Sequence, residues 1–156
     1  MTVGRVDRAP RPDDFAAPPT PVDRVRWAAA DRAVRPERLG RLRARLVEAS
    51  LDAYFGVRSE HARYLTGFAL GDGEDRVAGS SGWFLVTGDG LMLLADSRYR
   101  IQAEREAPDA RIEPVYGDLE KRWPDLVGGA GVRRVGVEAA YVSQAVWTRL
   151  AAAAPD

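Results

Sequence analysis

Apolar side chains recur along the chain with both helical and strand-like spacing, which predicts an α/β domain. Leucines in the segment 36–50 recur at helical spacing opposite a run of arginines, and Pro36 suits a first helical turn. Short apolar runs bounded by turn residues predict strands further along. After residue 50, we expect strands at 53–57, 83–87, 91–95, 111–115 and 134–138, and helices at 59–67, 97–107 and 118–123 and from Ser143 onward.

Two of the predicted strands are joined by Gly88-Asp89-Gly90. Asp-Gly between two apolar runs is a strong signal for a β-hairpin. Helices and strands alternate after the hairpin, which indicates crossover connections and some parallel pairing. We therefore expect an α/β fold with a mixed, mostly five-stranded sheet and helices on both faces.

The N-terminal segment differs in composition from the rest. Half of the chain's 10 prolines lie between Pro10 and Pro21, and the charges around them follow no apolar period. Such a segment buries too little surface to offset the entropy of ordering. The expected organisation is a flexible tail at 1–34, with at most a short helix at 22–34, and a globular domain at 35–156.

Composition excludes several classes of function. The chain has no Cys and one His, so a disulfide scaffold, a thiolate metal site and cysteine nucleophile chemistry are ruled out. Lys+Arg and Asp+Glu both number 23, which gives no general attraction to nucleic acid or to an anionic membrane. Without an apolar run of signal-peptide or membrane-spanning type, a cytoplasmic protein is expected.

The residues alone assemble no complete active site. His61 has the pKa range of a general base but also suits a packed position near a helix start. Asp96-Ser97-Arg98-Tyr99 follows a predicted strand, a usual ligand position in open α/β sheets, and a salt bridge between Asp96 and Arg98 would equally fix helix to sheet. We therefore assign no catalytic residue, no metal ligand and no cofactor to this chain.

Several segments together resemble the N-terminal domain of the creatinase, prolidase and aminopeptidase P family. They are Ser59-Glu60-His61-Ala62-Arg63-Tyr64-Leu65-Thr66-Gly67-Phe68, Gly79-Ser80-Ser81-Gly82, Leu94-Ala95-Asp96-Ser97-Arg98-Tyr99 and Gln102-Ala103. The resemblance covers about residues 35–156. It implies a ribonuclease H-like N-terminal domain that precedes a pita-bread catalytic domain beyond residue 156.

The resemblance also implies a function for the parent protein. In this family the catalytic domain holds two divalent metal ions (manganese, cobalt or zinc) that activate water against the bond before proline. The N-terminal domain forms dimer or tetramer contacts and caps the substrate cleft. We therefore expect no activity from this chain alone, and as partners its own catalytic domain, further copies of itself and, in the parent, a proline-containing peptide. Nucleic acid and membrane are not expected partners.

The residues carried over as substrate-cleft candidates lie in the matched segments or, for Trp83, directly after one. They are His61, Arg63, Tyr64, Phe68, Trp83, Arg98 and Tyr99. An insertion at 69–78 departs from the family pattern and would reshape the cap. Three alternatives remain open: a creatinase-like amidinohydrolase parent, a free-standing small-ligand-binding module that uses the edge 96–99, and an arginine-rich nucleic-acid binder.

Overall fold

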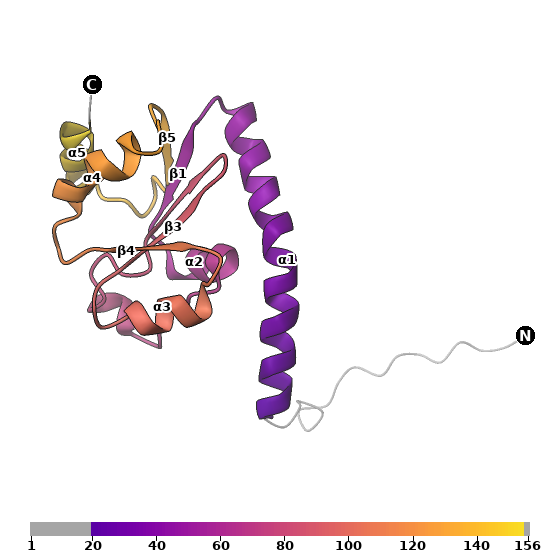
Figure 1. The fold of residues 1–156 in the computed structure, drawn as a ribbon. Helices are drawn as coiled ribbons and strands as arrows, with labels where there is room; N and C mark the ends of the chain where they lie inside the picture. Colours follow the sequence, from indigo (N-terminus) through magenta and orange to yellow (C-terminus); the bar gives the residue numbers. More distant parts are fainter. Residues whose placement is uncertain (1–19, 155–156) are drawn as a thin grey trace, which may run out of the picture. The chain divides into compact units, whose positions relative to one another are not determined.

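The computed structural model describes residues 20–154, and the chain divides into two units, residues 1–33 and 34–156. Most of the expected flexible tail, residues 1–19, lies outside the described residues. The helices are α1 (Pro21–Glu48), α2 (Ser59–Thr66), η2 (Glu74–Arg76, a short 3₁₀ helix), α3 (Arg100–Glu106), α4 (Leu119–Gly128) and α5 (Gln144–Ala153) (Figure 1). The strands are β1 (Ala53–Gly56), β2 (Phe84–Thr87), β3 (Leu91–Ala95), β4 (Arg111–Pro114) and β5 (Val135–Val137).

The five strands form one mixed sheet in the order β4-β3-β2-β1-β5, which confirms the predicted fold class. β2 pairs antiparallel with both β1 and β3, so the hairpin at Gly88-Asp89-Gly90 is also confirmed. The outer pairs β3–β4 and β1–β5 are parallel. The helix–strand alternation in the sequence indicated this parallel pairing because parallel neighbours need crossover connections.

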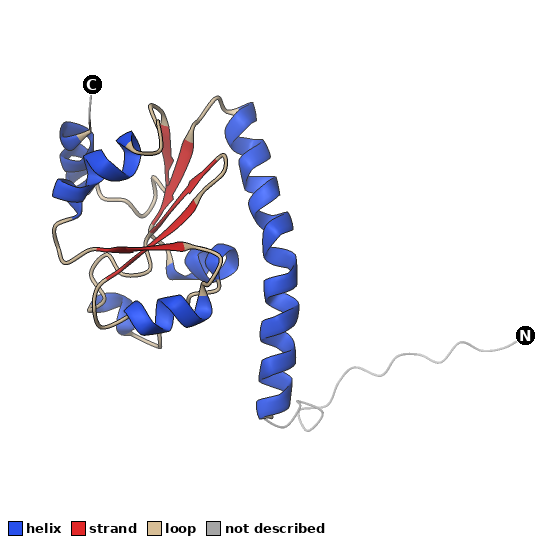
Figure 2. Ribbon diagram, in the orientation of Figure 1, coloured by secondary structure: helices blue, strands red, loops and turns tan. Residues whose placement is uncertain are grey.

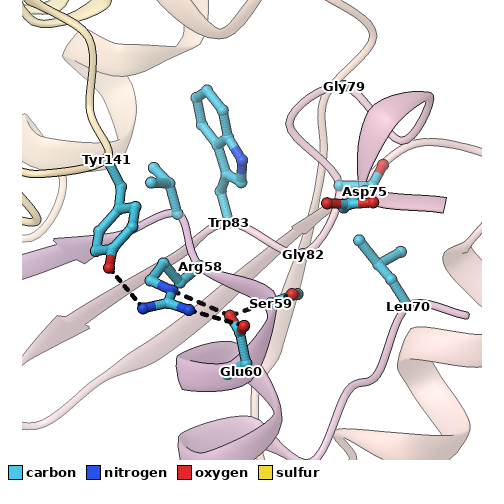
Figure 3. Close-up of a pocket in the computed structure, with 11 residues that line it drawn as sticks. Arg58, Ser59, Glu60, Leu70, Asp75, Gly79, Gly82, Trp83 and Tyr141 are labelled. Atoms are coloured by element: carbon cyan, nitrogen blue, oxygen red, sulfur yellow. Dashed lines mark hydrogen bonds and ion pairs between the residues drawn. The ribbon is translucent and has the colours of Figure 1, made fainter. Parts of the chain in front are cut away.

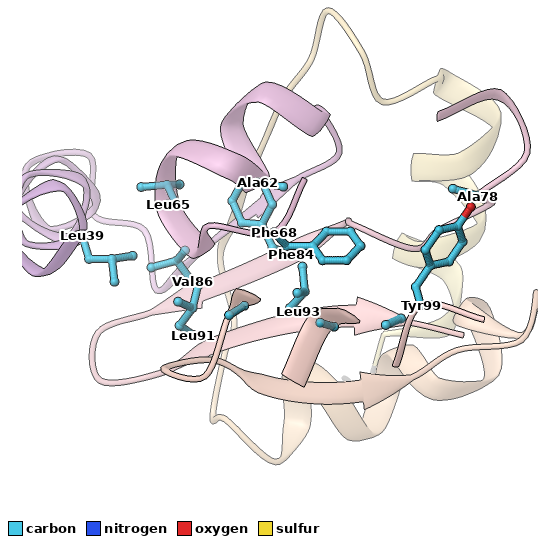
Figure 4. Close-up of a cluster of buried hydrophobic side chains, with 13 residues drawn as sticks. Leu39, Ala62, Leu65, Phe68, Ala78, Phe84, Val86, Leu91, Leu93 and Tyr99 are labelled. Atoms are coloured by element: carbon cyan, nitrogen blue, oxygen red, sulfur yellow. The ribbon is translucent and has the colours of Figure 1, made fainter. Parts of the chain in front are cut away.

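Helices cover both faces of the sheet, and each face has its own core (Figure 2). On one face, Leu39 of α1 packs with residues of α2, α3 and the hairpin (Figure 4). On the other face, α4 and α5 pack over β1 and the hairpin strands. Strands β2 and β3 are buried along their whole length, so they appear as unbroken apolar runs in the sequence instead of alternating ones.

Helix α1 differs from the prediction, because it is continuous through Pro36 instead of beginning there. Helix-forming residues on both sides of the proline outweigh the one hydrogen bond that it removes. The residue before it anchors the helix to the domain. Arg35 is buried, and its guanidinium donates to the carbonyl oxygens of Thr66 at 2.8 Å and Glu106 at 3.1 Å, at the ends of α2 and α3.

Three of the predicted helices have a serine at their expected start (Ser59, Ser97 and Ser143), and only Ser143 caps its helix. Ser143 accepts a hydrogen bond from the backbone N–H of Val146 at 3.2 Å and caps α5, which begins where the sequence predicted. Helix α2 begins one residue earlier than a Ser59 cap requires, with Arg58 in the capping position and no side-chain cap. Helix α3 begins at Arg100, because residues 97–99 form a turn. Gly67, the last residue of the predicted helix 59–67, ends α2 in the left-handed conformation.

Gly56 in β1 leaves room for the ring of Phe84, its partner in β2. A Cβ atom at this position would lie 2.1 Å from the Cζ atom of the Phe84 ring, which is itself in the core. We expect Gly56→Ala to lower the free energy of unfolding by about 1–3 kcal/mol through overpacking. Gly40→Ala is the matched control, since nothing lies within 4 Å of its Cβ position in α1. That change should stabilise the helix by about 1 kcal/mol. Urea unfolding of both variants tests this, and equal effects would contradict it.

Candidate functional site

The candidate site lies where two parallel strands end side by side. β1 and β5 pair in parallel register, from Ala53 opposite Val135 to Phe55 opposite Val137. Their carboxyl ends therefore lie at the same edge of the sheet. From this edge, β1 leads into α2 and β5 leads into the segment 138–143 that precedes α5.

Glu138, directly after β5, is a buried carboxylate with a side chain only 3% exposed. Its Oε2 accepts the backbone N–H groups of Val57 at 2.8 Å and Arg58 at 2.9 Å. Its Oε1 accepts the Tyr54 hydroxyl at 3.0 Å and lies 2.5 Å from Nδ1 of His61. These five residues form the Glu138 cluster, which joins the end of β5 to the end of β1 and the start of α2.

Hydrogen bonding keeps this buried carboxylate charged. Burial alone raises the pKa of Glu138, but hydrogen bonds from Val57, His61 and Arg58 outweigh it. The net pKa of Glu138 is therefore lower than its ordinary value of 4.5. Burial and the adjacent Glu138 charge raise the pKa of Tyr54, so its hydroxyl remains a donor.

An open cavity of about 340 Å³ lies beside the start of α2 and is drawn in Figure 3. We call it the Trp83 cavity. It is lined by Val57, Arg58, Ser59, Glu60, Leu70, Asp75, Gly79, Ser81, Gly82, Trp83 and Tyr141. The lining combines two aromatic side chains with both charge signs, a composition that suits a polar ligand with an apolar part. The segment 69–78 contributes Leu70 and Asp75 to the wall.

Arg58 is held in a fixed orientation at this cavity. Its Nε and Nη2 donate to the two carboxylate oxygens of Glu60 at 3.1 and 2.8 Å, and its Nη1 donates to the Tyr141 hydroxyl at 2.7 Å (Figure 3). The guanidinium carbon also lies 4.3 Å from the centre of the Tyr141 ring. The hydrogen bonds from Arg58 lower the pKa of Glu60 to about 2, so both members of this pair stay charged.

Two of the predicted cleft residues lie at or beside this cavity. Trp83 lines the cavity and meets Phe55 edge-to-face at a centroid distance of 5.8 Å. His61 belongs to the Glu138 cluster, and its side chain is 45% exposed. The bond to Glu138 occupies its Nδ1 and fixes the ring, which leaves Nε2 for contact with solvent or a ligand.

Arg63 and Tyr64 lie on the exposed side of α2. Tyr64 packs against α1, where the Arg38 guanidinium carbon lies 4.3 Å from the ring centre. Its hydroxyl accepts a hydrogen bond from Arg41 at 3.2 Å. About half of Tyr64 remains exposed, so these two residues present a separate surface and do not line the Trp83 cavity.

The remaining three candidates lie towards α3. Phe68 and Tyr99 are only 1% and 7% exposed and meet edge-to-face in the core (Figure 4). Arg98 forms the expected salt bridge with Asp96, with Nη2 2.6 Å from Oδ2, and this pairing lowers the pKa of Asp96. Asp96 also lines a separate hollow of about 220 Å³, so the structure does not bring Arg98 and His61 into one site.

Three residues of the site were missed by sequence reasoning: Arg58, Glu138 and Tyr141. One signal for Glu138 was present in the sequence: it is a carboxylate directly after a predicted strand. When that strand pairs in parallel with β1, the carboxylate falls at the same edge of the sheet as the start of α2. Using it requires the pairing of β1 with β5, which a pattern of apolar runs does not specify. The contact between Arg58 and Tyr141 likewise depends on the pairing of β1 with β5, because the two residues follow these two strands.

Within residues 20–154, no three His, Cys, Asp or Glu side chains group as metal ligands. The described part of the chain therefore does not fit a metal centre, and we derive no chemical step through one. In the same residues, no helix is long and apolar enough to cross a membrane.

The model of the Creatinase/Prolidase N-terminal domain family matches residues 38–156, which is most of the chain. The chain belongs to this family. The match begins inside α1, so the first part of that helix precedes the family domain. No curated protein sequence matches the chain.

Solved structures of similar domains agree with the family. The N-terminal domain of the cytoplasmic peptidase PepQ from Mycobacterium tuberculosis H37Rv is 29% identical, with a TM-score of 0.61 over 75% of this chain and 84% of that one. The Xaa-Pro aminopeptidase from Streptococcus thermophilus is 26% identical, with a TM-score of 0.62 over 77% of this chain and 85% of that one. An Xaa-Pro dipeptidase from Bacillus anthracis shares the fold at 22% identity and a TM-score of 0.66 over 77% of this chain. This creatinase/prolidase N-terminal domain covers 31% of that dipeptidase.

Replacing the charge of Glu138 tests the cluster. Glu138→Gln turns an acceptor of four donors into a group with its own N–H donors, so we expect a loss of about 1.5–3 kcal/mol in unfolding free energy at neutral pH. Because the folded pKa of Glu138 is lowered, its contribution is complete above the ordinary value of 4.5 and is lost as pH falls through the folded pKa.

As pH falls below about 5, the Glu138→Gln variant should therefore lose less unfolding free energy than the unmodified domain. Urea unfolding at several pH values measures this difference. Glu48→Gln, at an exposed glutamate paired with Arg45, is the control and should leave the pH dependence unchanged. Parallel stability curves for Glu138→Gln and the unmodified domain would contradict the assigned role.

Proposed function

We propose that this chain is the non-catalytic N-terminal domain of an Xaa-Pro aminopeptidase- or dipeptidase-like metallopeptidase, where it takes part in subunit association and caps the substrate cleft. The match to the family over residues 38–156 supports the parent class. Further support comes from the relatives in M. tuberculosis and S. thermophilus, the first a domain of a peptidase and the second an Xaa-Pro aminopeptidase. Because the M. tuberculosis peptidase is cytoplasmic, the similarity also favours a cytoplasmic location for this protein.

The observation that best supports capping is the Trp83 cavity with its preorganised charges. A cap has to present polar groups to a peptide without reorganising when the peptide arrives. Arg58 is held by Glu60 and Tyr141, and the start of α2 is held by Glu138. Together with Trp83, these groups offer a peptide both an apolar contact and hydrogen-bonding partners.

In this proposal the hydrolytic chemistry belongs to a separate catalytic domain. That domain would hold two divalent ions, of manganese, cobalt or zinc, and this chain would supply no ligand to them. The domain would associate in a dimer or tetramer, so that the Trp83 cavity and the exposed Tyr64 face of α2 meet a cleft formed with another part of the assembly.

The parent class is tested with the full product of the reading frame. Loaded with manganese, it should hydrolyse Xaa-Pro peptides and leave creatine intact, because the proposed parent attacks the bond before proline. Product analysis by chromatography separates the two substrates. Hydrolysis of creatine without Xaa-Pro cleavage would establish the amidinohydrolase alternative and contradict the proposal.

Capping is tested by steady-state kinetics on the same full product. Arg58→Ala removes the oriented guanidinium, so we expect KM for an Xaa-Pro tripeptide to rise about threefold to tenfold with kcat within about twofold, the pattern for a lost binding contact. Arg45→Ala is the control, since Arg45 is exposed on α1 and paired with Glu48. An unchanged KM for Arg58→Ala would exclude the cavity from the substrate path.

A further inference from the structure

Helices α4 and α5 lie on the sheet face opposite α2 and α3 (Figure 1). A second cavity is lined by residues of these two helices and of β5. We call it the Trp123 cavity. Its volume is about 530 Å³, within the range of roughly 300–1,000 Å³ that is usual for small-molecule sites. It is lined by Trp123, Val127, Gly128, Gly131, Val132, Arg133, Val135, Trp147, Ala151 and Ala154. None of these residues belongs to the Glu138 cluster or lines the Trp83 cavity.

The lining of the Trp123 cavity is mostly apolar and contains one charged residue, which is exposed. Two indole rings and three valines provide apolar surface, and Arg133 is the single charged residue of the lining. The lining contains no carboxylate. A cavity with this lining attracts an anion with an apolar body and disfavours a cation.

The polar side-chain groups of this lining are all donors, and none of them has a partner among the residues that the structure describes. Within residues 20–154, the side chains of Trp123, Trp147 and Arg133 make no hydrogen bond or ion pair. Trp123 as a whole is only 2% exposed. In the same range, the one unpartnered side-chain donor that is sealed from solvent is Arg122 Nε, so the N–H of Trp123 is not sealed. The Trp123 N–H therefore keeps some access to solvent, and Trp123 is among the residues that line this cavity.

The carboxylate of Asp52 binds the backbone of Arg133 and not its guanidinium. Oδ2 of Asp52 accepts the backbone N–H groups of Arg133 at 3.0 Å and Arg134 at 2.8 Å, which fixes the backbone at the start of β5. These bonds lower the pKa of Asp52. The backbone is thus anchored while the Arg133 guanidinium stays available for an external acceptor.

We propose that the Trp123 cavity binds a small aromatic monocarboxylate, with its ring between the indoles of Trp123 and Trp147 and its carboxylate against Arg133. Aromatic rings meet indoles favourably edge-to-face or in offset stacks. A guanidinium binds a carboxylate through two parallel hydrogen bonds. This assignment is independent of the proposed peptidase function, because no residue is shared between the two cavities.

Calorimetric titration of the chain with 4-phenylbutyrate tests the proposal, with 4-phenylbutanamide as the uncharged probe. We expect saturable binding of the acid with Kd below about 1 mM and binding of the amide at least about tenfold weaker. Tryptophan fluorescence should change with the same Kd, since two of the four tryptophans line the cavity. No saturable binding of the acid, or equal affinity for acid and amide, would overturn the proposal.

Two variants and one control locate the site. Arg133→Gln should weaken binding of the acid about tenfold, and Arg134→Gln, at the neighbouring arginine outside the lining, should not change it. Ala151→Leu fills the cavity from the exposed side of α5 and should abolish binding even if Arg133→Gln fails to fold. Equal weakening by both arginine variants, or unchanged binding in Ala151→Leu, would overturn the proposal.

The same titration on the full product of the reading frame decides whether the site is open there. Ala154, the last described residue, lines the cavity. Binding with the same Kd in the full product supports a ligand site. Loss of binding there would show that this chain itself fills the cavity and would overturn the proposal.

Discussion

The buried carboxylate of Glu138 is the constraint on which the candidate site depends. A charged group with almost no access to water is stable in a fold only when hydrogen bonds replace its hydration. Here the replacements come from the end of β1 and the start of α2, so the fold satisfies Glu138 only when these two elements meet β5 in the observed register. Satisfying the carboxylate therefore also positions Arg58 and His61.

The two faces of the sheet are packed in different ways. On one face, the buried guanidinium of Arg35 ties α1 to the carboxyl ends of α2 and α3, where helix dipoles favour positive charge. On the other face, α4 and α5 pack on an apolar core and leave the Trp123 cavity between them. The Glu138 cluster joins the end of β5 to the end of β1 and to the start of α2, on the face that also holds α1 and α3.

Local signals in the sequence predicted most of the fold. The unbroken apolar runs of β2 and β3, the Asp-Gly turn between them and the terminating Gly67 each depend on residues close in sequence. Pro36 was misleading because a proline suits a first helical turn in general, while in α1 the favourable residues on both sides extend the helix through it. Whether a helix begins at a proline or continues through it depends on the helix-forming tendency of all the residues around it, and not on the proline alone.

The candidate site was less predictable because its contacts join distant parts of the chain. His61 and Glu138 are 77 residues apart, and Arg58 and Tyr141 are 83 apart. The local motif that contains His61 and Phe68 does not show that His61 bonds to Glu138 or that Phe68 is buried in the core. The family resemblance supplied the correct fold and drew attention to His61 and Trp83, but it did not indicate which glutamate holds this edge of the sheet together.

Amide hydrogen exchange on the full product, with and without a slowly hydrolysed Xaa-Pro peptide, tests most directly whether the edge held by Glu138 faces substrate. The account predicts slower exchange on peptide binding at residues 57–64 and 138–141, with no change at 119–128 in α4. Exchange at 57–64 and 138–141 that is the same with and without the peptide would contradict it.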